Sequence, residues 1–124
     1  MNISIQGMLL ICITLFAIAA AGGLVMAGVR AFSQRNPPAW LALLHGLLAG
    51  AGLTLLLLVY FVSGLPALAA WALLLFIVAA AGGVLMNLGY QWQQKPLPLG
   101  LMYGHALIAV IGFVLLVWAA VGGA

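Results

Sequence analysis

Four long apolar runs constrain this chain more than any other feature of its sequence. A helix that crosses a hydrocarbon core of about 30 Å needs roughly 20 predominantly apolar residues, and each run reaches that length. The sequence therefore predicts four membrane-spanning helices, at Ile5 to Val29, Ala39 to Val62, Ala67 to Gly89 and Leu97 to Val121.

The charge content predicts that the surroundings of these helices are lipid. Of 124 residues, 69% are hydrophobic and 2% are charged, and no Asp or Glu occurs. Three charged side chains cannot cover the surface of a soluble domain of this size. They also form no basic stripe or patch, so we expect the lipid bilayer, and no nucleic acid, as a partner.

The chain matches itself at an offset of 60 residues, which indicates a tandem duplication. The run Ala-Ala-Ala-Gly-Gly at 19–23 returns at 79–83, and the register holds without a gap through His45 and His105. Between 15–58 and 75–118, 17 of 44 positions are identical. We expect one transmembrane domain over residues 1–124, built from two helical hairpins at about 5–62 and 67–121.

An even number of helices per repeat gives both copies the same direction through the membrane. Equivalent residues then lie at equal depth around a pseudo-twofold axis along the membrane normal. Short connections make neighbouring helices antiparallel, so the predicted fold class is an all-α, up-down four-helix transmembrane bundle.

The three cations predict the orientation of the bundle. Arg30, Arg35 and Lys95 fall in the segments 30–38 and 90–98, and positive loops favour the cytoplasmic side. We expect a multi-pass protein of a bacterial inner membrane, with these two loops in the cytoplasm and both termini outside.

His45 and His105 are the two histidines of the chain, and both lie within the apolar runs. Each follows a proline by seven residues, about 10 Å along a helix, so both reach one depth on parallel helices. Ionisable residues inside membrane spans usually face the bundle interior and serve function. They can bond to backbone or water, or share a metal.

Small residues beside the histidines predict a flat space between the helices. They occur four and seven positions after each histidine, and again as Gly-Gly pairs on the first and third helices at the same depth. The members of this predicted wall are Ala49, Gly52, Ala109, Gly112, Gly23 and Gly83. Such residues also let membrane helices pack closely without any ligand, so both interpretations stay open.

A porphyrin suits this donor set better than a bare ion does. Two histidines without acidic residues cannot complete a four-ligand zinc site, whereas haem needs only axial ligands. We therefore expect haem b bound by His45 and His105, with Arg35 and Lys95 near its propionates. Another pigment, or a structural or proton-handling role for the histidines, remains an alternative.

The two histidines on parallel, non-adjacent helices resemble the membrane-integral b-type cytochromes, in which such residues clamp one haem. The resemblance covers the four-helix arrangement, His45 and His105. It implies bis-histidine ligation and electron transfer, with a quinone or a redox protein as partner. Larger members of such families hold a second haem, for which this chain has no further histidine.

Two other functions compete with electron transfer. One is a small transporter, for which the histidines would have to replace the buried carboxylate that proton-coupled export normally needs. The other is an accessory subunit without a cofactor, within a homodimer or a larger membrane complex. An electron carrier is favoured over an enzyme that makes bonds, because six-coordinate iron has no open position.

Overall fold

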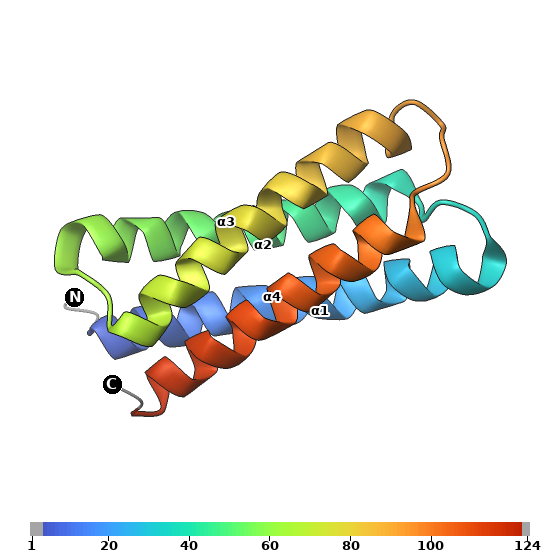
Figure 1. Cartoon of the computed structure of the whole chain (residues 1–124). Coiled ribbons are helices and arrows are strands. Elements are labelled where there is room, and N and C mark those ends of the chain that lie inside the picture. Colours follow the sequence, from blue (N-terminus) through green and yellow to red (C-terminus); the bar gives the residue numbers. More distant parts are fainter. Residues whose placement is uncertain (1–3, 123–124) are drawn as a thin grey trace.

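The computed structural model describes residues 4–122, which form an antiparallel bundle of long helices (Figure 1). The helices are α1 (Ile5–Ser33), α2 (Ala39–Ser63), α3 (Ala67–Met86) and α4 (Leu99–Ala120), and a π-helix, η1 (Asn87–Gln91), continues α3. All four spans are long and apolar enough to cross a membrane. The predicted fold class is therefore confirmed, and the chain is a multi-pass integral membrane protein.

The helix boundaries follow from local backbone chemistry and differ slightly from those predicted. Pro38, Pro66 and Pro98 each directly precede a helix, where a missing N–H costs nothing. Gln34 ends α1 in the left-handed region at φ 57°, and its repeat-equivalent Gln94 has φ 55°. As a result α1 continues to Ser33, four residues beyond the predicted limit, and α4 begins at Leu99.

The loops that connect the helices lie at two opposite ends of the bundle. The start of α1, the end of α4 and the turn between α2 and α3 lie at one end, and the loops 34–38 and 92–98 lie at the other (Figure 1). Gln6 donates to the Ala120 carbonyl over 3.1 Å at the first end, and Asn36 donates to the Lys95 carbonyl over 2.6 Å at the second. All three cations therefore belong to one end.

The bundle centre shows the duplication as physical symmetry. Phe16 and Phe76 occupy equivalent positions and stack with ring centroids 3.9 Å apart and planes 10° apart. Because equivalent residues can touch each other only near the axis that relates them, the pseudo-twofold axis passes between these rings. Leu56 and Leu116 are another equivalent pair in this core, and both are fully buried.

Glycines allow the phenylalanines to reach the axis. A Cβ at Gly52 would lie 3.1 Å from Cζ of Phe16, and one at Gly112 would lie 3.4 Å from Cε1 of Phe76. The first distance is closer than ordinary van der Waals contact and the second is at its lower limit, and the stacked partner limits how far either ring can retreat. These glycines therefore permit the close approach within each hairpin.

We expect Gly52→Val to destabilise the bundle, because its side chain would displace Phe16 from the stack. Overpacking of a core typically costs about 1–3 kcal/mol. Gly50→Val is the matched control, since nothing lies within 4 Å of a Cβ at that position of the same helix. Thermal unfolding in detergent measures the difference, and equal unfolding temperatures for the two variants would contradict the packing described.

Candidate functional site

His45 of α2 and His105 of α4 make the same hydrogen bond in the two repeats. Nδ1 of His45 lies 2.7 Å from the carbonyl oxygen of Ala19 on α1, and Nδ1 of His105 lies 2.7 Å from that of Ala79 on α3. Both rings are half-buried. The predicted inward orientation and equal depth of the histidines are thus present, each ring held by the other helix of its own hairpin.

The repeated Gly-Gly pairs make these bonds possible. A Cβ at Gly23 would lie 3.1 Å from Cε1 of His45, and one at Gly83 would lie 3.4 Å from Cε1 of His105. A larger residue there would hold the ring away from the helix backbone. Gly23 and Gly83 therefore adjoin the histidines as predicted, and the imidazoles themselves fill the space that these glycines leave.

The carbonyl partners determine where each ring carries its proton. A carbonyl oxygen can only accept, so Nδ1 must be the protonated nitrogen that donates to Ala19 or Ala79. In a neutral ring, Nε2 then carries the lone pair. Metal-ligating histidines commonly donate their second nitrogen to a carbonyl in this way, which fixes both tautomer and ring orientation.

The two rings face each other across the pseudo-twofold axis. Their centroids are 6.2 Å apart and their planes make an angle of 68°. Metal–imidazole bonds of about 2 Å, plus roughly 1 Å from nitrogen to ring centre on each side, separate two axial ligands of one ion by about 6 Å. The rings approach each other edge to face, and the distance between their centroids is one that two imidazoles on a single metal would also have.

The other predicted wall residues lie farther along the bundle than the histidines do. Gly52 and Gly112 are seven residues beyond the histidines, about 10 Å along the helix, and pack against the phenylalanine pair. Ala49 and Ala109 are half-buried between these two levels. The structure thus gathers His45, His105, Gly23 and Gly83 at one level, and puts the Gly52 and Gly112 pair at another.

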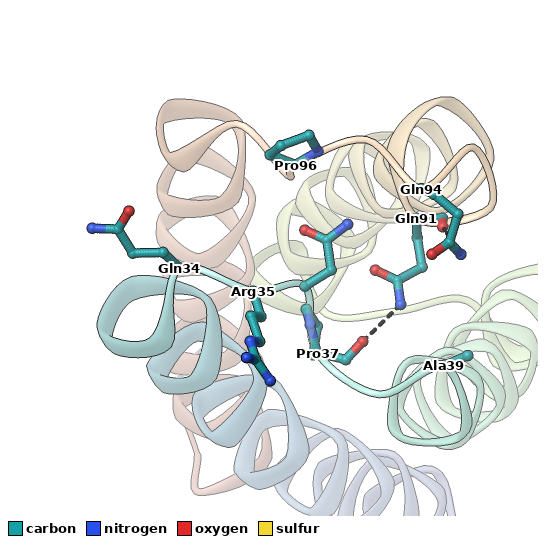
Figure 2. A pocket seen from close by; sticks show the side chains of 8 residues that line it. Gln34, Arg35, Pro37, Ala39, Gln91, Gln94 and Pro96 are labelled. Carbon is teal, nitrogen blue, oxygen red and sulfur yellow. Dashed lines mark hydrogen bonds between the residues drawn. The ribbon is translucent and has the colours of Figure 1, made fainter.

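The three cations differ in their surroundings. Arg30 is half-buried and donates from Nε to the Leu97 carbonyl over 2.9 Å, linking the two repeats. Arg35 is exposed and lines a cavity of about 430 Å³ at the loop end (Figure 2). Lys95 is exposed on the neighbouring loop. Neither histidine lines the cavity that contains Arg35.

Sequence reasoning missed the backbone acceptors and the aromatic pair of this site. The Ala19 and Ala79 carbonyls carry no side-chain signal, although both belong to the repeated Ala-Ala-Ala-Gly-Gly run. Phe16 and Phe76 are identical in the two repeats and could have been identified from that match. Arg30 has no charged equivalent, since Tyr90 occupies its position in the second repeat.

Fold and site together define an integral membrane bundle with one symmetric histidine pair near its loop end. No protein-family model, curated protein or solved structure matches this chain.

We expect Gly23→Val to break the hydrogen bond between His45 and Ala19 and to leave that of His105 intact. Nitrogen-15 spectra of the protein with ring-labelled histidine report the protonated Nδ1 directly. Gly28→Val is the control, because a Cβ at that position of α1 has nothing within 4 Å. Unchanged ring signals in Gly23→Val would contradict the role assigned to this glycine.

Proposed function

We propose that this chain is a membrane-bound b-type haem protein that carries electrons, with His45 and His105 as the axial ligands of one haem. One observation supports this most strongly. Two repeat-equivalent imidazoles lie with centroids 6.2 Å apart inside an apolar bundle, and each donates from Nδ1 to a carbonyl. Nε2, the nitrogen left for coordination, is thereby defined on both rings.

The donor set fits haem better than other metal groups. The chain contains two histidines, one cysteine and no acidic residues, so it cannot supply the four His, Cys or carboxylate ligands of a structural zinc site by itself. Haem brings four equatorial nitrogens and, when bound, supplies reversible one-electron transfer. The protein's part is to hold two neutral imidazoles in fixed orientation and to exclude water with the surrounding apolar side chains.

Bis-histidine ligation favours electron transfer over substrate chemistry. Both axial positions would be filled by imidazole, which leaves none for oxygen or another substrate. His45 lies six residues after Ala39, the first residue of α2, which is about 9 Å along the helix. We therefore propose that a quinone or a redox protein exchanges electrons with the haem at the loop end.

The cations of the loop end are the proposed partners of the haem propionates. Arg30 is the most favourable of them, because it is half-buried and its Nε is already oriented by the Leu97 carbonyl. Lys95 lies at the same end, as predicted, and remains a second candidate. Arg35, the third cation, belongs to the separate cavity of Figure 2.

We expect the purified protein, after haem supplementation, to show a Soret band and a sharp α band on reduction with dithionite. His45→Ala and His105→Ala should each abolish the reduced low-spin spectrum, because one axial ligand is lost. Leu47→Ala and Leu107→Ala are matched controls. These residues occupy equivalent positions two residues beyond each histidine and are 63% and 62% exposed, so they face lipid.

A folded protein that takes up no haem would contradict this function. Substrate flux in pigment-free proteoliposomes that is lost in His45→Ala would instead favour a transporter. Co-purification with a larger complex at constant stoichiometry, unaffected by replacing both histidines, would favour an accessory subunit.

We also propose that the loops 34–38 and 92–98 face the cytoplasm, because all three cations lie at that end of the bundle. Single cysteines can test this in a Cys12→Ala background, since buried Ala72 is the equivalent of buried Cys12. In intact cells, a membrane-impermeant maleimide should label Ser63→Cys and should label Gln93→Cys only after permeabilisation. The opposite labelling pattern would reverse the orientation.

A further inference from the structure

Arg35 has no acidic side chain in its own chain with which to pair. The protein contains no Asp or Glu, and its formal net charge is +3. All three cations lie at the loop end, where their positive potentials add. An anion that neutralises this end must therefore come from the solution, from the membrane, from a cofactor or from a partner.

The cavity beside Arg35 is built from groups that suit an anion. It has a volume of about 430 Å³ and lies between the loop 34–38 and the segment that follows α3 (Figure 2). Its lining consists of Gln34, Arg35, Asn36, Pro37, Ala39, Gln91, Gln94 and Pro96. Arg35 is the cation of this lining, which contains no acidic residue. Three of its four amide side chains, those of Asn36, Gln91 and Gln94, already donate to backbone carbonyls and so fix the wall around the guanidinium.

Two further features of the wall support a polar ligand. Ala39 is the first residue of α2, and the N-terminal end of a helix carries partial positive charge. Gln91 donates from Nε2 to the Pro37 carbonyl over 2.7 Å, whereas its Oε1 is buried with no hydrogen-bond partner among residues 4–122. The wall therefore combines positive potential at the start of α2 with a hydrogen bond that links the loop 34–38 to η1.

A second cavity, of about 230 Å³, adjoins the first at Ala39 and has a different character. Its other lining residues are Trp40, Leu43, Asn87 and Trp92, and the two tryptophans are 66% and 71% exposed. Tryptophan is typical of the level where hydrocarbon meets headgroups. The polar, cationic cavity and the aromatic one thus share Ala39 in their linings.

We propose that these adjoining cavities bind one anionic phospholipid. Its phosphodiester pairs with Arg35 and the loop amides, and its hydrocarbon chain lies against Trp40 and Trp92. Phosphatidylglycerol is an anionic phospholipid that can serve as the probe. Neither histidine lines either cavity, so the site is independent of haem binding, and it assigns Arg35 to lipid instead of a propionate.

Lipid titration of the full-length protein in a neutral detergent tests the proposal. Native mass spectrometry counts bound lipid, and tryptophan fluorescence follows occupancy beside Trp40 and Trp92. We expect one phosphatidylglycerol per chain, with phosphatidylcholine and inorganic phosphate binding at least about tenfold more weakly. Binding should be the same in haem-loaded and haem-free protein, which separates this proposal from the proposed function.

Arg35→Gln and Lys95→Gln form a matched pair for the decisive comparison. Each removes one positive charge from equivalent positions at the same end, but only Arg35 lines the cavity. We expect Arg35→Gln to weaken phosphatidylglycerol binding about tenfold, as expected for loss of a charge-assisted hydrogen bond, and Arg35→Lys to restore part of it. Lys95→Gln should change binding by less than about twofold.

Three results would overturn the lipid site. Equal weakening by Arg35→Gln and Lys95→Gln would mean unspecific attraction to the positive end. Equal binding of phosphatidylcholine would remove the role of charge, and saturation by inorganic phosphate at the same concentrations as lipid would assign the cavity to a free anion. Unfolding temperatures measured alongside confirm that each variant is folded.

Discussion

The hydrogen bond from each imidazole to a helix carbonyl is the interaction on which this structure depends. A polar ring inside a membrane bundle is costly unless it finds a partner, because lipid offers none. Here the partner is the Ala19 or Ala79 carbonyl, and the glycine four residues further on lets the ring come close enough to reach it. This bond holds the two helices of a hairpin in register and, at the same time, directs Nε2 away from the backbone.

Gene duplication turns this local arrangement into a site. One hairpin alone would present one oriented imidazole, which is a weak basis for binding anything. Two equivalent hairpins around an axis bring His45 and His105 to 6.2 Å between ring centres, and they bring Phe16 and Phe76 into a stack. The stacked rings fill the bundle centre about 10 Å from the histidines. This distance is estimated from the seven residues that separate His45 from Gly52. The aromatic stack and the histidine pair therefore lie at different levels along one axis.

Much of this arrangement could be predicted from the sequence because hydrophobic run length and internal repetition are signals that tertiary context does not alter. The four spans, the antiparallel order and the common depth of the histidines follow from them.

The partners of the small residues could not be predicted in the same way. In a sequence, a glycine shows only that a side chain is absent. Gly23 and Gly52 therefore look alike, although Gly23 adjoins His45 and Gly52 adjoins Phe16. Deviations from the repeat could not be predicted either. One of them is the π-helix η1, because the equivalent positions 27–31 of α1 remain α-helical. The bond from Arg30 to Leu97 joins the two repeats and has no counterpart at Tyr90.

The central claim is that the two imidazoles coordinate one iron from opposite sides. Electron paramagnetic resonance of the oxidised, haem-supplemented protein tests it most directly, because the spin state reports the axial ligands. The proposed site predicts a low-spin ferric signal from the intact protein, replaced by a high-spin signal when either histidine is changed to alanine. A high-spin signal from the intact protein, or a low-spin signal that survives loss of His105, would contradict coordination by this pair.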